Sequence, residues 1–240
     1  MTQVNRLQTF TKNKQGRDFV VGDIHGCYTK LMQKLDEINF DFNKDRLFSV
    51  GDLIDRGPEN EQCLELIYEN WFFPVMGNHE LLMMNAIFNR KSALWFRNGG
   101  QWILTSDLLT DEIALYAQEI NLLVPFAIEI TDGEKKIGIV HAEPSHDWNI
   151  VRDFCQKEYD VKDILKGHTI NKREAITFYR MTWGRTRHKI NIQTVVKNID
   201  QVIVGHTINE NPINLGNVRY IDTGCFYTDN ITVEELNFNF

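Results

Sequence analysis

The stretch SVGDLIDRG, residues 49–57, ends a short apolar run with a glycine and then presents two aspartates and an arginine. Two other stretches have the same form: VVGDIHG at residues 20–26 and VMGNHE at residues 75–80. Each apolar run predicts a β-strand, and each glycine predicts the turn that ends it. The polar side chains after the three glycines are therefore expected at the ends of three strands.

Helical patterns separate these strands. Apolar residues between 31 and 38 recur every three or four positions, after Thr29, which is a favourable helix-capping residue. Pro58 is predicted to open a second helix, and a third is predicted over 80–88, after a strand at 71–76. This alternation predicts an α/β fold with parallel strands joined by right-handed crossovers. Ligands of such sheets bind at the carboxyl ends of the strands, where all three glycine blocks fall.

The remainder of the chain predicts more strands and one less regular segment. Residues 91–118 have a helical and loop-rich pattern. Further strands are predicted at 126–130, 136–140, 201–204, 219–221 and 231–236, the first two forming a hairpin. The stretch 144–192 has a weak pattern and is more basic, so we interpret it as an insertion or lid. We expect a single catalytic domain over residues 1–240.

Composition narrows the class of protein. A chain of 240 residues with 42% hydrophobic and 25% charged residues is typical of a soluble globular domain. A net charge of −7 weighs against a nucleic-acid-binding surface, which is rich in lysine and arginine. The sequence has no apolar run of about 20 residues that would span a membrane, and residues 1–16 do not have a signal-peptide pattern. The four cysteines lack a Cys-x-x-Cys spacing, which favours a reducing, cytoplasmic compartment.

The side chains after the glycines can bind metal ions. Asp23 and His25 are two positions apart, so in an extended segment both point the same way and can meet one ion. Asp52 has two carboxylate oxygens and can bridge two ions. Together with Asn78 and later histidines, these oxygen and nitrogen donors suit a pair of borderline divalent cations. Each block taken alone is also consistent with a plain turn before a helix, and their conjunction predicts a binuclear metal hydrolase acting on phosphate esters.

The three blocks resemble the signature motifs of the phosphoprotein phosphatase superfamily. CYTKLM at 27–32, EQCLELI at 61–67 and NGG at 98–100 extend the similarity toward its phage and bacterial branch, which includes the serine/threonine phosphatase of bacteriophage lambda. The resemblance is dense over 18–102 and returns near His141 and over 205–224. It implies a calcineurin-like metallophosphoesterase fold, a β-sandwich of mixed sheets flanked by helices, with the metal site at the carboxyl ends of strands.

The resemblance also implies roles for individual residues. The first metal ion would be bound by Asp23 and His25, and Asp52 would bridge the two ions. The ligands of the second ion would be Asn78, His141 and His206. The proton donor would be His79, oriented by Asp55, and the phosphate would be held by Arg56.

Two assignments require a choice between alternatives. The segment Trp183-Gly184-Arg185 matches the Trp-x-Arg that carries a second phosphate-binding arginine in this superfamily, and we assign that role to Arg185. The alternative is that the basic run around it is a solvated surface. The stretch GHTIN occurs twice, at 167–171 and 205–209. We assign the metal ligand to His206, because a buried-strand pattern precedes it, whereas His168 follows what looks like the end of a helix. His146 and His188 are expected at the surface.

The implied function is that of a metal-dependent phosphomonoesterase. It would be a protein serine/threonine phosphatase, also active on phosphotyrosine, that hydrolyses by direct attack of a metal-bridging hydroxide. Its partners would be phosphorylated proteins or peptides and small phosphomonoesters, with no membrane partner, in a bacterial or phage-infected cell. Because the ligand set contains no cysteine, Mn²⁺ is the expected metal, with iron or zinc as alternatives.

Three other functions compete with this one. A related symmetrical dinucleoside tetraphosphate hydrolase shares the first block, but it usually has a small residue where this chain has Asp55, and aspartate in place of Glu80. An inactive metal-binding module would usually have lost a ligand, and none is missing here. The basic run around Arg185 favours a nuclease or phosphodiesterase, but the negative net charge of the chain and the lack of interleaved aromatic residues weigh against this function.

Overall fold

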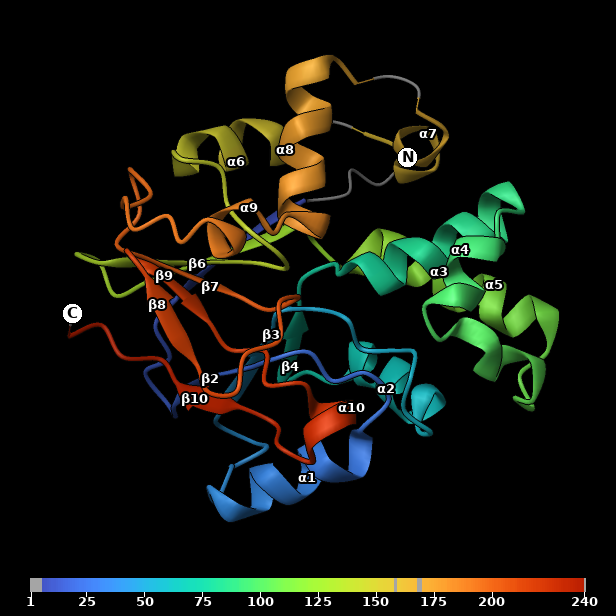
Figure 1. Cartoon of the computed structure of the whole chain (residues 1–240). Helices are drawn as coiled ribbons and strands as arrows, with labels where there is room; N and C mark the ends of the chain where they lie inside the picture. The colour runs from blue at the N-terminus through green and yellow to red at the C-terminus, as the bar shows by residue number, and fades with distance from the viewer. Residues whose placement is uncertain (1–5, 158, 168–169, 240) are drawn as a thin grey trace.

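The computed structural model describes residues 6–157, 159–167 and 170–239 (Figure 1). Its centre consists of two mixed β-sheets with helices on their outer sides. The four-stranded sheet has the order β10-β2-β3-β4, in which β2, β3 and β4 are parallel and β10 is antiparallel to β2. Its strands are β2 (Asp18–Val21), β3 (Arg46–Ser49), β4 (Phe72–Pro74) and β10 (Val233–Glu235). The predicted parallel unit is confirmed.

The six-stranded sheet has the order β1-β5-β6-β7-β9-β8. The predicted hairpin is present as the antiparallel pair β5 and β6, and β6, β7 and β9 are parallel neighbours. Two of its strands, β1 and β8, are short edge strands that the sequence pattern did not predict. The strands are β1 (Leu7–Thr11), β5 (Ala127–Thr131), β6 (Lys136–Val140), β7 (Gln201–Val204), β8 (Ile213–Leu215) and β9 (Val218–Tyr220).

Alternate side chains of the central strands fill two separate cores. Val20 and Phe48 join Ile128 and Ile139 in a cluster between the two sheets. Their neighbour Val21 belongs instead to the larger cluster beneath the outer helices. Because successive side chains of a strand point to opposite faces, a strand buried on both faces must be apolar throughout. This explains why the runs before the glycine blocks are continuous rather than alternating.

The helices cover the outer faces of both sheets. In Figure 1, α6, α8 and α9 lie above the six-stranded sheet, α1 and α10 lie below the four-stranded sheet, and α3 to α5 lie at one end. The stretch 144–192, interpreted as an insertion or lid, contains α6 to α9. The described helices are α1 (Tyr28–Glu37), α2 (Asn60–Glu65), η1 (Leu66–Tyr68), α3 (Asn78–Asn89), α4 (Ala93–Arg97), η2 (Gly100–Leu104), α5 (Thr110–Leu123), α6 (Trp148–Cys155), α7 (Val161–Lys166), α8 (Lys172–Trp183), α9 (Thr186–Lys189) and α10 (Cys225–Thr228).

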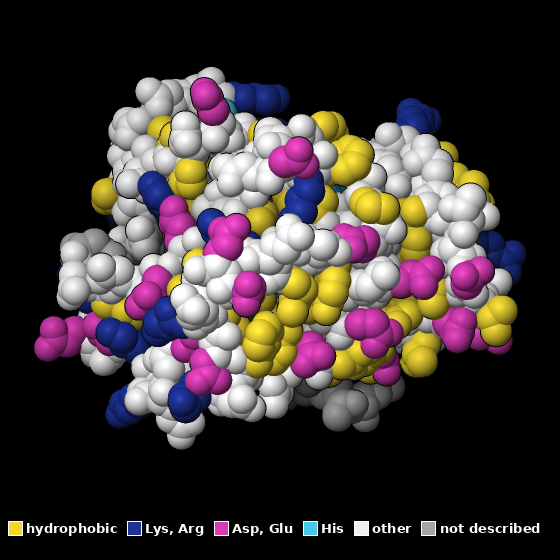
Figure 2. Space-filling view, turned by 90° about the horizontal axis from the view of Figure 1, so that it is seen from below, with side chains coloured by type: hydrophobic (Ala, Val, Ile, Leu, Met, Phe, Trp, Pro, Cys, Tyr) yellow, Lys and Arg dark blue, Asp and Glu magenta, His cyan; other side chains and the backbone are white. Residues whose placement is uncertain are grey.

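The surface is mixed in charge on the face seen from below Figure 1. Figure 2 shows acidic side chains spread over this face, with basic side chains between them and hydrophobic side chains near the centre. This face therefore does not present a single basic surface. None of the helices in the described ranges combines the length and apolar character that a membrane crossing needs.

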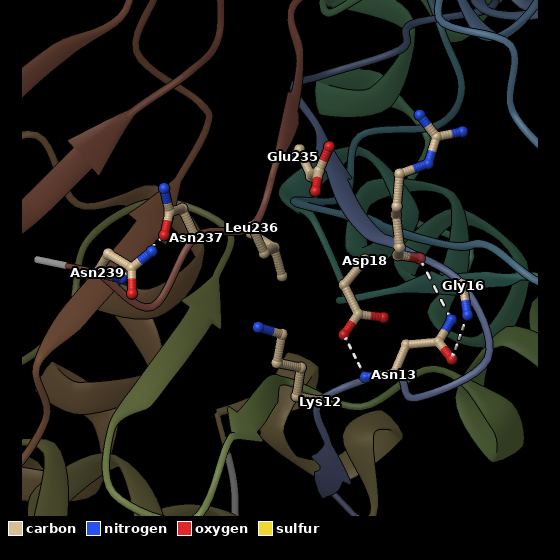
Figure 3. A pocket seen from close by; sticks show the side chains of 9 residues that line it. Lys12, Asn13, Gly16, Asp18, Glu235, Leu236, Asn237 and Asn239 are labelled. Atoms are coloured by element: carbon tan, nitrogen blue, oxygen red, sulfur yellow. Dashed lines mark hydrogen bonds between the residues drawn. The ribbon is translucent and has the colours of Figure 1, made fainter.

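One pocket lies at the amino-terminal end of β2, away from the glycine blocks (Figure 3). It has a volume of about 460 Å³ and lies between the loop after β1 and the residues that follow β10. Its polar groups bond to one another: the backbone N–H of Asn13 donates to Asp18 Oδ2 at 2.8 Å. None of the predicted site residues lines it.

Candidate metal centre

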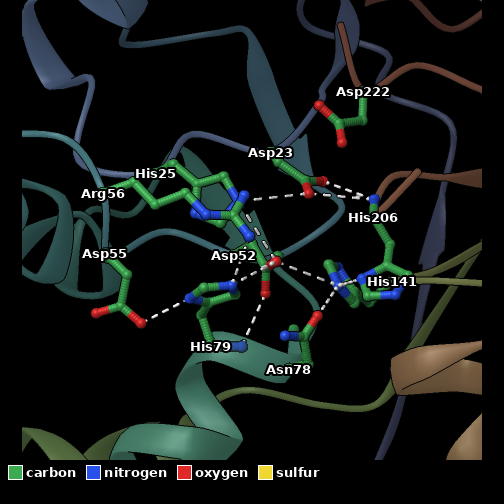
Figure 4. Close-up of polar contacts among 12 residues, drawn as sticks. Asp23, His25, Asp52, Asp55, Arg56, Asn78, His79, His141, His206 and Asp222 are labelled. Atoms are coloured by element: carbon green, nitrogen blue, oxygen red, sulfur yellow. Dashed lines mark hydrogen bonds and ion pairs between the residues drawn. The ribbon is translucent and has the colours of Figure 1, made fainter. Parts of the chain in front are cut away.

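The predicted site residues lie together at the carboxyl ends of strands from both sheets (Figure 4). The four-stranded sheet delivers residues after β2 and β3 and at the start of α3, which follows β4. The six-stranded sheet delivers His141 directly after β6 and His206 shortly after β7. His168, the alternative to His206, lies outside the described residues. Of the two other histidines left out of the site, His146 is exposed, and His188 is half-buried and bonded to Asn209.

The turns that present these residues have unusual backbone geometry. A glycine is required at Gly77, because a Cβ there would lie 2.2 Å from Asp52 Oδ1. Left-handed backbone in non-glycine residues is costly and is often found at functional sites. The site residues with positive φ are His25 (47°), Asp52 (51°), Asp55 (76°), Arg56 (72°) and His206 (64°).

One group of candidate metal-binding atoms surrounds His25. Its Nδ1 donates to the carbonyl oxygen of Ile54 at 2.9 Å, so Nε2 carries a lone pair. That atom lies 3.6 Å from Asp52 Oδ2 and 3.8 Å from Asp23 Oδ2. Burial lowers the pKa of His25 to about 3, so the imidazole is neutral, and its Nε2 accepts from Nη1 of Arg56 at 2.6 Å. The lone pair that could bind a metal ion is thus directed at a positively charged group.

A second group surrounds His141. Its Nδ1 donates to the carbonyl oxygen of Val50 at 2.8 Å, which again leaves a lone pair on Nε2. Nε2 lies 2.9 Å from Asn78 Oδ1, 3.1 Å from His206 Nδ1 and 3.4 Å from Asp52 Oδ2. Burial, and then the neighbouring His141, lower the pKa of His206 to about 2. Three other atoms that can bind a metal ion, from Asn78, His206 and Asp52, therefore lie within 3.4 Å of His141 Nε2.

This crowding fits bound divalent cations. Lone pairs of neutral imidazoles, an amide oxygen and a carboxylate repel one another unless a cation lies between them, and this mixture of nitrogen and oxygen donors suits borderline metals. Ligand atoms within 4.8 Å of one another define two groups that share Asp52: His25, Asp52 and His79, and Asp52, His141 and His206. Burial alone would raise the pKa of Asp52, but the surrounding histidines outweigh it and lower that pKa.

His79 lies beside this centre with a different hydrogen-bond partner. Its Nδ1 is 2.6 Å from Asp55 Oδ2, and its backbone N–H donates to Asp52 Oδ1 at 2.9 Å. Its Nε2 lies 3.1 Å from Nη2 of Arg56 and 3.8 Å from Asp52 Oδ2. Burial alone would lower the pKa of His79, but Asp52 and Asp55 outweigh it and raise that pKa. This histidine therefore differs from His25 and His141 in its Nδ1 partner, which is a carboxylate instead of a backbone carbonyl.

Two arginines line the pocket that opens on the centre. Arg185, which follows α8, donates from Nη2 to the carbonyl oxygen of His206 at 3.2 Å. The pocket has a volume of about 300 Å³. Its lining includes Asp52, Arg56, Asn78, Arg185, His206 and Tyr227. The two guanidinium groups and the crowded acceptors thus border the same space.

Sequence reasoning assigned no site role to two buried carboxylates. Glu80 accepts the backbone N–H groups of Asp52, Leu53 and Gly77 at 2.8–3.0 Å, joining the second and third glycine blocks. Asp222 follows β9 and is buried beside Asp23, and burial raises its pKa to about 6. The GNHE stretch contained a signal for Glu80, and Asp222 directly follows the strand predicted at 219–221, within the resemblance over 205–224. The contact of Asp222 with Asp23 could not be predicted, because the two residues are far apart in sequence.

The fold and the two groups of candidate metal ligands are those of a metallophosphoesterase, and residues 19–210 match the calcineurin-like phosphoesterase family. The chain belongs to this family of hydrolases. It is 34% identical over 224 residues to serine/threonine-protein phosphatase 1 of Salmonella typhimurium, with 91% of each chain covered. It is also 28% identical over 185 residues to a symmetrical bis(5'-nucleosyl)-tetraphosphatase of Wigglesworthia glossinidia brevipalpis, covering 75% of this chain and 63% of that protein.

Solved structures with the same fold are similar to this chain. A cold-active protein-tyrosine phosphatase from a psychrophilic Shewanella superposes with a TM-score of 0.64 at 16% identity, covering 96% of this chain and 78% of the other. The expected calcineurin-like architecture of mixed sheets flanked by helices is confirmed.

Proposed function

We propose that this protein is a metal-dependent phosphomonoesterase that removes phosphate from phosphoserine and phosphothreonine in proteins, and also from phosphotyrosine. The observation that carries the proposal is the pocket in which Arg56 and Arg185 border the crowded acceptors around Asp52. A dianionic phosphate fits between two guanidinium groups and bound cations. The similarity to a bacterial serine/threonine phosphatase, which covers 91% of each chain, supports the same substrate class.

The buried donors would hold two divalent ions. We assign Asp23 and His25 to the first, Asp52 to both, and the second to Asn78, His141 and His206. Mn²⁺ is the proposed metal, with iron or zinc as alternatives, because borderline nitrogen and oxygen donors accept all three. When bound, such a pair lowers the pKa of a water molecule and neutralises charge on the phosphate.

The remaining residues would bind the substrate and move a proton. Arg56 and Arg185 would hold the non-reacting phosphate oxygens, because guanidinium groups donate in a fork that matches them. His79 would give the proton on Nε2 to the departing oxygen, with Asp55 keeping the ring oriented through Nδ1. The four buried free cysteines support a reducing compartment such as the bacterial cytoplasm.

Symmetrical hydrolysis of dinucleoside tetraphosphates is the second candidate. The similarity to a tetraphosphatase favours it, although that match covers less of both chains. The presence of Asp55, which pairs with His79, and of Glu80 favours the phosphoprotein phosphatase branch, because the motifs of that branch resemble this chain at both positions.

A side-by-side assay would test the proposal. The protein would be stripped with chelator, reloaded with Mn²⁺, and offered a phosphoserine peptide, a phosphotyrosine peptide and diadenosine tetraphosphate. We expect metal-dependent release of phosphate from both peptides and little cleavage of the dinucleotide. A much higher kcat/KM on the dinucleotide would establish the second candidate instead, and full activity in the stripped protein would refute the metal mechanism.

A further inference from the structure

Asp55 receives more hydrogen bonds than its pairing with His79 explains. The carboxylate is fully buried, and two indole N–H groups reach it from the segment 93–104. Trp95 Nε1 lies 2.9 Å from Oδ1 and 3.0 Å from Oδ2, while Trp102 Nε1 donates to Oδ1 at 2.8 Å. The two tryptophans are 40 and 47 residues from Asp55 in sequence, so only the fold brings the three together.

The chemistry of indole fixes which partner donates in these hydrogen bonds. Trp Nε1 is a donor only, so the Asp55 oxygens that face Trp95 and Trp102 must accept. A buried carboxylate is costly unless donors surround it, and bonds to an ionised group are the stronger kind. The two indoles therefore keep Asp55 an acceptor and stop its carboxylate from rotating. Oδ2 is then held toward Nδ1 of His79.

The glycines of the NGG motif explain how the tryptophans reach this position. The Trp95 ring packs directly on Gly100, where a Cβ would lie 2.4–2.5 Å from ring atoms. Gly99 has φ of +109°, and a Cβ there would lie 2.9 Å from the backbone nitrogen of Arg56. The motif thus lets the segment 93–104 approach the Asp55–Arg56 turn closely. A residue with a side chain would not fit at Gly99 or Gly100 without moving the neighbouring atoms.

We propose that Trp95 and Trp102 are positioning residues for proton donation by His79. They would act through Asp55, which holds the His79 ring so that its Nε2 proton meets the leaving oxygen. The inference rests on the proposed phosphomonoesterase function. In the step concerned, the oxygen of water forms a bond to phosphorus and the bond from phosphorus to the leaving oxygen breaks. The Nε2 proton moves to that oxygen, the two hydrogens of the water remain on the phosphate that is formed, and Asp55 keeps accepting from Nδ1 of His79 and from the two indoles.

The test uses leaving groups that differ in their need for a proton. Trp95→Phe, Trp102→Phe and the double variant retain an aromatic ring but lose the donors. Their kcat would be measured on phenyl phosphate, whose leaving group needs protonation, and on p-nitrophenyl phosphate, whose leaving group hardly does. We expect the double variant to lose roughly tenfold or more on phenyl phosphate and less than about threefold on p-nitrophenyl phosphate, within the range of general-acid catalysis.

A matched control is available in Trp71→Phe. Trp71 is also buried and donates its indole N–H to a carboxylate, Glu69 Oε2, at 2.9 Å, but it precedes β4 at the end away from the site. We expect it to leave both rates unchanged. Thermal unfolding and metal content of every variant would report a purely structural effect.

Three results would decide against the inference. Equal losses on both substrates would indicate a structural role, and no loss on either would show that the indoles are not needed. A wild-type protein that hydrolyses neither aryl phosphate with any metal would refute the proposed function together with this inference. A wild type that cleaves both, but no phosphopeptide, would refute only the protein substrate and leave the comparison valid.

Discussion

At the scale of single residues, the partner of each Nδ1 atom separates the histidines into two kinds. His25 and His141 donate from Nδ1 to backbone carbonyls, and burial lowers the pKa of both. His79 instead pairs through Nδ1 with a carboxylate, and its pKa is raised because Asp52 and Asp55 outweigh burial. Neutral imidazoles bind cations, whereas a ring whose Nδ1 is paired with a carboxylate is suited to passing a proton through Nε2, and this difference in Nδ1 partner supports the proposed division of roles.

Replacing His79 tests that division directly. We expect His79→Asn to retain bound metal and to lose about 10²–10⁴-fold in kcat on a phosphoserine peptide, because the leaving alkoxide then lacks its proton donor. The loss on p-nitrophenyl phosphate should be much smaller. Steady-state kinetics with metal analysis would measure this, and similar losses on both substrates would contradict the assignment.

Arg185 lies in a basic segment, and its position in the pocket makes its role testable. Arg185→Ala should raise KM or lower kcat/KM by roughly 10- to 100-fold, since a hydrogen bond to a charged group is worth about 1.5–3 kcal/mol. Arg180→Ala is the matched control, because Arg180 lies on the same basic segment but lines a different pocket. Equal effects of the two substitutions would show that only the general basic charge matters.

At the scale of elements, three strand-to-helix turns must keep a common geometry, and Glu80 joins two of them. It lies in the first turn of α3 and accepts N–H groups from the turns after β3 and β4. The sequence indicated an acidic residue at a helix start, which the helix dipole favours. The contacts add a second role, because the same carboxylate holds the backbone of Asp52.

Removing Glu80 should therefore destabilise the whole protein. We expect Glu80→Ala to lower the free energy of unfolding by about 3 kcal/mol or more, because each unsatisfied buried donor costs about 1–3 kcal/mol. Urea denaturation would measure the change. Glu37→Ala, which removes only an exposed contact with Lys34, should change stability by less than about 1 kcal/mol. Equal, small effects would show that water replaces the carboxylate without cost.

At the scale of the whole molecule, the centre forms only where the two sheets meet. Asp52 and Asn78 come from turns of the four-stranded sheet, and His141 and His206 from the six-stranded sheet. Cations bound at this junction would link the two sheets. Metal binding should therefore be visible in global stability as well as in activity.

Metal addition should raise the unfolding temperature of chelator-treated protein. At a free metal concentration 100-fold above Kd, linkage predicts about 2.7 kcal/mol of added stability per site. His206→Ala should lose much of this gain, whereas His146→Ala, at an exposed position, should retain it. Calorimetry with and without Mn²⁺ would measure both. A wild-type protein whose unfolding is insensitive to Mn²⁺, iron and zinc would contradict the assigned centre.

The sequence by itself determined the elements that short local patterns encode. The continuous apolar runs before the glycines specify strands buried on both faces, and the parallel β2-β3-β4 unit follows from their order. Helix α1 begins at Tyr28 rather than at Thr29, because the Thr29 side chain bonds to Glu59 instead of capping its own helix. The edge strands β1 and β8 escaped prediction because polar residues interrupt their apolar ones, so neither has the continuous apolar run of the predicted central strands.

Only the tertiary structure decided which distant groups share the site. The sequence marked Asp55 and His79, but Trp95 and Trp102 read as ordinary aromatic residues until the fold placed their N–H groups on Asp55. The same holds for the contact of Asp222 with Asp23. Arg185 was already marked by its motif, and the structure adds that it lies on the pocket wall. The physical reason is that local patterns record the burial of a residue and the turn it occupies, whereas hydrogen-bond partners across the core are set by how the sheets and helices pack.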